Sequence, residues 1–100
     1  HIERNYFLKM KKYIAISGKV QGVGFRYWLQ ALAIKRNIYG WVKNKTSGDV
    51  EALLVGQEKE IQELIKLCEI GPRTAKINHV QVNDYNKDYT KKGFDIIKSD

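Results

Sequence analysis

The chain has few of the residues on which many catalytic and structural sites depend. Its 100 residues include one cysteine, one proline and two histidines. The single cysteine, Cys68, cannot form an internal disulfide, which suits a reducing compartment, and we expect a cytoplasmic protein. No apolar run approaches the roughly 20 residues that cross a bilayer, so we expect no membrane partner. The sequence thus excludes a domain stapled by its own disulfides and a membrane-spanning helix.

The remaining composition is that of one folded domain. Hydrophobic residues make up 43% of the chain and aromatic residues 11%, and a domain of this size buries roughly 60 to 65% of the surface that its unfolded form exposes. Met10 opens a stretch that looks like a natural start, so we expect residues 1–9 to be a leader or a cloning-derived extension and residues 10–100 to form one domain. We expect this domain to act as a monomer. The formal net charge of +7 favours anionic partners.

The spacing of apolar residues alternates between the strand period and the helix period. Ile14 and Ile16 share one face of an expected strand, whereas Phe25, Leu29 and Ala33 lie on one stripe of an expected helix. The expected elements are a strand at 12–17, a helix from 25 to about 36, strands at 38–45 and 50–55, a helix at 58–69, and strands at 75–85 and 94–97. The glycine at position 56 is expected to end the third strand.

This order of elements predicts the fold class. Two strand-helix-strand units joined through a hairpin form an open antiparallel sheet with both helices on one face. We therefore expect an α+β, ferredoxin-like fold with the order βαββαβ and a short fifth strand near the end of the chain. In such a sheet the first and third strands flank the centre, and the second lies to one side.

A glycine-rich stretch lies between the first expected strand and the first expected helix. It reads Gly-Lys-Val-Gln-Gly-Val-Gly-Phe-Arg from position 18 to position 26. Three glycines within seven residues let the chain curl tightly and let an anion approach the main chain without meeting a Cβ. The helix start adds unpaired N–H groups and a positive dipole end, and Arg26 adds a planar fork of donors. The stretch predicts a phosphoryl-binding site, although such glycines also serve tight turns that bind no ligand.

A second feature, Asn44, stands near the end of the second expected strand. It closes the run Gly-Trp-Val-Lys-Asn at positions 40–44, and Gly48 follows after three further residues. Taken alone, an asparagine before a turn is a turn residue. Whether Asn44 reaches the glycine-rich stretch depends on how the strands are arranged, and the sequence leaves this open.

Together the two features resemble both signature motifs of the acylphosphatase family, in the same order. The similarity in element order extends from about residue 12 to residue 97, nearly the whole chain. The resemblance implies a small stand-alone acylphosphatase, in which loop amides and an arginine hold the phosphoryl group while an asparagine orients the attacking water. Carried over by motif position, the implied amide donors are Gln21, Gly22, Val23, Gly24 and Phe25, the arginine is Arg26, and the asparagine is Asn44.

The residue types in the two motifs limit the chemistry. Neither motif contains His, Cys, Asp or Glu, so the site offers no obvious nucleophile, metal ligand or conventional general base. It can supply positioning and charge stabilisation, which are the principal demands of phosphoryl transfer. An acyl phosphate suits such a site because its leaving carboxylate departs without a proton. We expect an acyl phosphate and inorganic phosphate as small-molecule partners, with no metal and no cofactor.

Two other functions share parts of this pattern. RNA-recognition domains have the same sheet order and a positive charge, but they need stacking aromatics on the central strands, and the expected strand at 50–55 has none. We therefore expect no nucleic-acid partner. A related domain stands at the start of a hydrogenase-maturation carbamoyltransferase that acts on carbamoyl phosphate. The length of the chain and its two complete motifs favour a stand-alone enzyme.

Overall fold

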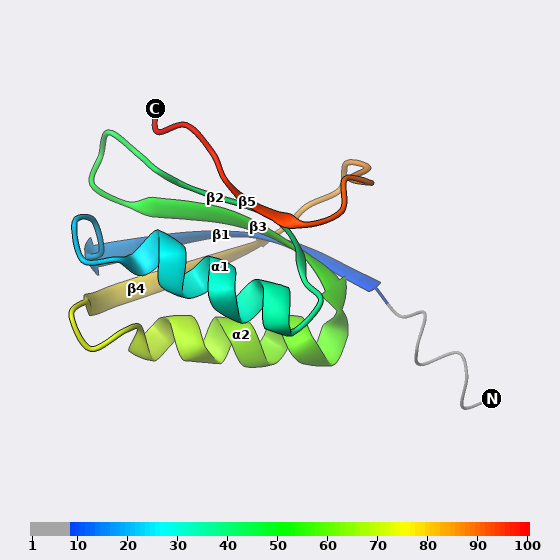
Figure 1. Cartoon of the computed structure of the whole chain (residues 1–100), viewed down its shortest axis with the longest axis horizontal. Helices are drawn as coiled ribbons and strands as arrows, with labels where there is room; N and C mark the ends of the chain where they lie inside the picture. Colours follow the sequence, from blue (N-terminus) through cyan, green and yellow to red (C-terminus); the bar gives the residue numbers. More distant parts are fainter. Residues whose placement is uncertain (1–8) are drawn as a thin grey trace.

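The computed structural model describes residues 9–100 and contains one five-stranded sheet and two helices (Figure 1). The expected leader lies outside the described residues except for Lys9, which begins the first strand. The elements, in chain order, are β1 (Lys9–Lys19), α1 (Phe25–Lys35), β2 (Tyr39–Asn44), β3 (Val50–Gln57), α2 (Glu58–Ile70), β4 (Lys76–Asp84) and β5 (Phe94–Ile96). The predicted order of elements and the ferredoxin-like fold are therefore confirmed.

The strands lie in the order β4-β1-β3-β2-β5, so β1 and β3 occupy the centre as predicted. The first four strands pair antiparallel, but β5 pairs parallel to β2. The parallel pairing arises because the turn-rich segment 86–93 reverses the chain after β4. The last strand then returns along the opposite edge of the sheet, in the direction of β2. The sheet is consequently mixed at that edge.

Both helices cover the same face of the sheet, as Figure 1 shows. Ile14 and Ile16 of β1 are fully buried beneath them. The helices contribute the buried side chains of Phe25, Leu29 and Ala33 from α1 and of Ile61, Leu64 and Cys68 from α2. Burial raises the pKa of the Cys68 thiol to about 12, so this side chain stays protonated at neutral pH and acts as a small apolar core residue. Among residues 9–100, neither helix is long and apolar enough to cross a membrane.

Two predictions about glycines are wrong. Gly18 belongs to β1 and lies at a β-bulge, where a Cβ would stand 2.1 Å from the carbonyl oxygen of Lys76. It therefore permits the close approach of β4 and lies within the strand, not in the glycine-rich turn where the sequence placed it. Gly56 does not end β3 but pairs with Met10 in the ladder, and its missing side chain leaves room for Ile38.

Candidate active site

The topology brings the glycine-rich loop and Asn44 to the same end of the sheet, where β1 and β2 terminate. Both β1 and β2 run antiparallel to β3, so they point in the same direction and their C-terminal ends lie together. The loop at 20–24 follows β1 and leads into α1, and Asn44 is the last residue of β2. In Figure 1 the loop and the β2–β3 hairpin lie at the same end of the molecule. The structure thus settles the proximity that the sequence left open.

Two glycines of the loop adopt a left-handed backbone conformation. Gly22 and Gly24 have φ angles of 73° and 80°, in the left-handed region that favours glycine. Gly24 is the N-cap of α1, where no side chain caps the helix and no acidic residue stands in the first turn. Within residues 9–100, none of the N–H groups at 21–25 donates to a main-chain carbonyl. Five successive amides are therefore free of main-chain partners at the positive end of a helix dipole.

The loop is fixed to the rest of the fold on several sides. The side chains of Val20 and Phe25 are both 1% exposed and anchor its two ends in the core. Its outer side is held by the hydroxyl of Thr74, which donates to the carbonyl of Val23 at 2.6 Å. Its other side is held by the amide of Gln21, which reaches the β2–β3 hairpin. These attachments hold the free amides in place, so that binding an anion requires little ordering of the chain.

Arg26 lies in the first turn of α1 and is half-buried. Gln30, one turn later on the same side of the helix, donates to the carbonyl of Phe94 in β5 at 2.8 Å. This contact places the Arg26 side of α1 toward the β2 and β5 edge of the sheet. Among residues 9–100, no carboxylate pairs with the Arg26 guanidinium. Its charge is therefore not neutralised within the described fold.

Asn44 carries a polar atom without a partner. Its backbone pairs with Val50 in the ladder, and its carbonyl accepts from the N–H of Asp100 at 3.2 Å. Its side chain points to the helix-covered side of the sheet, because Val42, two residues earlier, is buried there. The side-chain Oδ1 is buried and has no hydrogen-bond partner within residues 9–100. An unpaired buried acceptor costs free energy, so this oxygen marks a position where a donor is expected.

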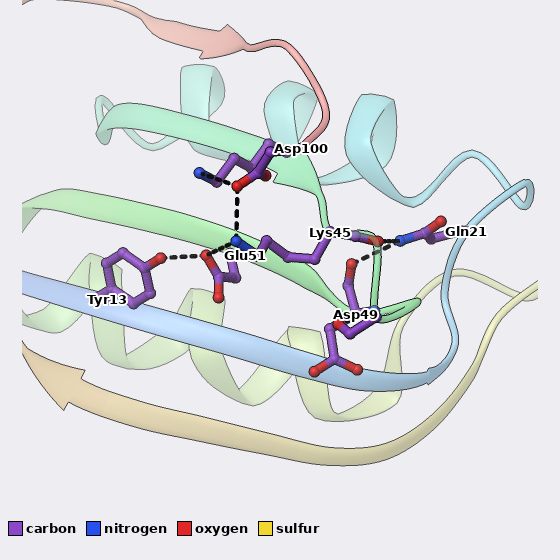
Figure 2. A network of polar contacts seen from close by, with 8 residues as sticks. Tyr13, Gln21, Lys45, Asp49, Glu51 and Asp100 are labelled. Carbon is purple, nitrogen blue, oxygen red and sulfur yellow. Dashed lines mark hydrogen bonds and ion pairs between the residues drawn. The ribbon is translucent and has the colours of Figure 1, made fainter.

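A charged network on the opposite face of the sheet supports the hairpin that carries Asn44 (Figure 2). The Tyr13 hydroxyl donates to Glu51, and the Lys45 ammonium lies 3.8 Å from Glu51 and 2.8 Å from Asp100. The hydrogen bond to Asp100 raises the pKa of Lys45, and the same bond lowers the pKa of Asp100. Sequence reasoning missed this network because its members lie far apart in the chain and follow no motif spacing.

The remaining candidates for chemistry do not gather at the loop. His79 is exposed on β4, and Lys43 lies over the ring of Trp41, 5.2 Å from its centroid. Within residues 9–100, no group of three or more His, Cys, Asp and Glu side chains is arranged to hold a metal ion. Among residues 9–100, the polar groups at this end of the sheet for which the fold offers no partner are backbone amides of the loop, the Arg26 guanidinium and the Asn44 side-chain oxygen.

Known proteins resemble this chain in sequence and in fold. A family model described as Acylphosphatase matches residues 12–96. An acylphosphatase of Rhodopseudomonas palustris (strain BisB5) is 41% identical over 75 residues, which cover 75% of this chain and 76% of that protein. The crystal structure of acylphosphatase from Bacillus subtilis superposes with a TM-score of 0.84 at 35% identity, covering 88% of this chain and 98% of that one. Full-length HypF, in its phosphate- and nucleotide-bound form, superposes with a TM-score of 0.82 at 34% identity, covering 92% of this chain but 12% of that one.

Proposed function

The chain belongs to the acylphosphatase family of hydrolases, and we propose that it hydrolyses acyl phosphates with the loop that follows β1 and with Asn44. One juxtaposition carries this proposal. The unpaired amides at 21–25 lie at the positive end of α1, and the hairpin beside them carries the unpaired oxygen of Asn44. The first group suits a phosphoryl anion, and the second suits a hydrogen-bond donor such as water.

The phosphoryl group is bound by main-chain donors and by Arg26. The N–H groups of Gln21, Gly22, Val23, Gly24 and Phe25 donate to its oxygens, as amides at helix N-termini do for anions. The planar guanidinium of Arg26 can donate to two phosphate oxygens at once. As water attacks, negative charge on the three equatorial oxygens meets donors that are already in place, which lowers the barrier.

Asn44 orients the attacking water. Its Oδ1 accepts a hydrogen bond from the water, whose oxygen forms a bond to phosphorus while the bond from phosphorus to the acyl oxygen breaks. The electron pair of that bond leaves with the carboxylate, and the water proton passes to an oxygen of the substrate phosphate. Because Oδ1 is buried, the side chains around it must shift slightly to admit the water. The scheme uses no acid or base of the protein, no metal and no cofactor.

The other expected properties are part of the same proposal. Every group of the proposed site comes from one chain, so a monomer suffices. Residues 10–100 contain the whole site and nearly the whole sheet, and we propose that they form the functional domain. Cys68 is free and buried, which agrees with a reducing compartment, and we propose the cytoplasm.

RNA binding receives no support from the open face of the sheet. The central strand β3 carries no aromatic residue. The ring of Tyr13, on the other central strand, packs against Trp41 with centroids 5.7 Å apart and against Tyr85 with centroids 6.5 Å apart. Bases would therefore have to displace rings that already have partners.

A hydrolysis assay with two substrates tests the proposal. Benzoyl phosphate has a carboxylate leaving group, whereas an alkyl phosphate ester has a leaving group that needs a proton. With a chelator present, we expect release of inorganic phosphate from benzoyl phosphate alone, at the rate measured without chelator. Equal activity on both substrates, or loss of activity with the chelator, would contradict the proposed chemistry.

A further inference from the structure

The side chain of Gln21 joins the phosphate-binding loop to the hairpin that carries Asn44. Its Nε2 donates to the carbonyl of Lys45 at 2.7 Å and to the carbonyl of Asp49 at 2.8 Å (Figure 2). These two residues are the first and last of the turn between β2 and β3, where the N–H of Lys45 donates to the carbonyl of Asp49 at 2.8 Å. One carboxamide thus bonds to both sides of the turn, at the residue that directly follows Asn44 and at the residue that directly precedes Val50.

Each of the two carbonyl oxygens can accept one hydrogen bond from the glutamine amide. Each carbonyl oxygen accepts two hydrogen bonds. That of Lys45 already accepts from the N–H of Gly48 at 3.0 Å, and that of Asp49 already accepts from Lys45. The two N–H bonds of the Gln21 amide fill the remaining position on each oxygen. A carboxylate or a thioether of similar length has no donor for either oxygen.

These contacts fix the backbone next to Asn44. The carbonyl of Asn44 accepts from Asp100, the N–H of Lys45 donates to Asp49, and the carbonyl of Lys45 accepts from Gln21. The Cα atoms of neighbouring residues are about 3.8 Å apart, so the Gln21 bond acts one peptide away from the residue whose side chain oxygen is unpaired. The first amide of the proposed phosphate site belongs to Gln21 itself.

We propose that the Gln21 side chain is a positioning residue, which sets the distance between the phosphate-binding amides and the Asn44 oxygen. The inference rests on the proposed function. In-line attack needs the water held at a fixed distance and angle from the phosphorus atom. A displacement of about 1 Å can cost roughly 100-fold in rate. A direct bond between the two halves of the site keeps that distance constant when the hairpin moves.

The test is a double-mutant cycle on benzoyl phosphate. Gln21→Met keeps the length of the side chain, removes both donors and leaves the backbone amide of residue 21 in place. We expect kcat to fall about tenfold, within the loss that a misplacement of about 1 Å produces, while the inhibition constant for inorganic phosphate changes by no more than about twofold. In the Asn44→Ala background, Gln21→Met should lower kcat by no more than about twofold, because the residue on which it acts is absent.

Thr74→Val is the matched control. It removes the other side-chain hydrogen bond to the loop, which ends on Val23 and does not involve the hairpin. Its effect on kcat, whatever its size, should be the same in the parent and in the Asn44→Ala background. Gln21→Asn is the second variant, and it retains an amide on a shorter side chain. It should lower kcat less than Gln21→Met does, with the same dependence on Asn44. If Gln21→Met does not fold, Gln21→Asn takes its place in the double-mutant cycle.

The outcomes separate this inference from the proposed function. If Gln21→Met lowers kcat by the same factor in both backgrounds, or acts chiefly on phosphate inhibition, the positioning role is wrong while the proposed function stands. If Asn44→Ala hydrolyses benzoyl phosphate at the parent rate, the proposed function itself fails. A strong loss from Gln21→Met that vanishes without Asn44 supports both.

Discussion

Helix α1 carries an arginine at each end, and the two have different surroundings. Arg36, just after the last residue of the helix, donates to Glu60 at 3.1 Å and to Glu63 at 2.8 Å, both on α2. Arg26, in the first turn, has no carboxylate partner among residues 9–100. The hydrogen bond to Glu63 raises the pKa of Arg36. One arginine joins two helices, and the other has no carboxylate partner among residues 9–100, which leaves its charge available in the proposed site.

The helix ends explain this difference. The first turn of α2 carries Glu58 and Glu60, which complement its own positive end, whereas the first turn of α1 carries no acid. At the N-terminus of α1 the dipole, the free amides and Arg26 all favour an anion. The same residue type therefore has different surroundings at the two ends of one helix, because the rest of the fold presents carboxylates at one end and none among residues 9–100 at the other.

Cavity size is not a guide to the proposed site. A cavity of about 340 Å³ lies at the Arg36 end, where its lining includes Asn37, Tyr39 and Glu60, and one of about 420 Å³ lies between β1 and α2, where its lining includes Met10 and Ile65. The proposed chemistry lies at the other end of α1, on a loop that supplies donors. A phosphoryl group is small and needs hydrogen-bond donors more than volume. We therefore locate the proposed site by its hydrogen-bond donors and not by cavity volume.

Removing Arg26 should give the largest effect. Arg26→Ala removes a preorganised donor whose charge stabilises the transition state, and we expect kcat/KM for benzoyl phosphate to fall roughly 1000-fold. The thermal unfolding midpoint should stay close to the parent value, because this side chain makes no hydrogen bond or ion pair within residues 9–100. Steady-state kinetics and circular dichroism melts check the two halves of the prediction. Hydrolysis at the parent rate would remove Arg26 from the site.

Removing the Asn44 side chain tests whether the site proposed at the Arg26 end of α1 uses a second side chain besides Arg26. Asn44→Ala should lower kcat about 100-fold, as the loss of one oriented polar contact in a transition state does. The inhibition constant for inorganic phosphate should change by no more than about threefold, because the amides and Arg26 remain. Equal losses in turnover and in phosphate binding would show that Asn44 contacts the anion and not the water.

Giving Arg26 a carboxylate of its own should make it resemble Arg36. Gln30→Glu places an acid one turn away on the same side of α1, where pairs at this spacing interact. We expect KM for benzoyl phosphate to rise about tenfold relative to Gln30→Met. The methionine variant is the control, since it also loses the hydrogen bond to Phe94. If the two variants have the same KM, the availability of the Arg26 charge does not matter.

Removing Arg36 should give the smallest effect on catalysis. Arg36→Ala should keep kcat/KM within about twofold of the parent, because the side chain lies at the opposite end of α1 from the proposed site. The unfolding midpoint should fall, since both Glu60 and Glu63 lose their partner. Raising the NaCl concentration to 1 M should reduce the difference in midpoint, because these pairs are partly exposed and are screened by salt. A large loss of activity with an unchanged midpoint would reverse the assignment of the two arginines.

Local patterns in the sequence predict most of the fold. Apolar periodicity places every helix and strand to within a few residues, as with Ile14 and Ile16 on the buried face of β1. The extra strand residues at Gly18 and Gly56 could not be predicted, because each depends on how closely another part of the chain approaches. The parallel pairing of β5 likewise depends on the edge to which segment 86–93 returns the chain.

The residues of the proposed site could be named from the sequence, but their connections could not. The glycine pattern and Arg26 are contiguous in sequence, so a shared role can be proposed from the sequence alone. That this loop and Asn44 lie at the same end of the sheet follows only from the order β1-β3-β2. The Gln21 bonds reach carbonyls 24 and 28 residues away, and main-chain carbonyls leave no trace in a sequence. Such links can be found only in a structure.

A titration of ¹⁵N-labelled protein with inorganic phosphate, followed through its amide resonances, tests the central claim most directly. Binding at the proposed site predicts saturable shifts that are largest at the backbone amides of residues 21–26, with little change around Arg36. Shifts concentrated at residues 35–39, or no saturable shift at 21–26, would contradict the account.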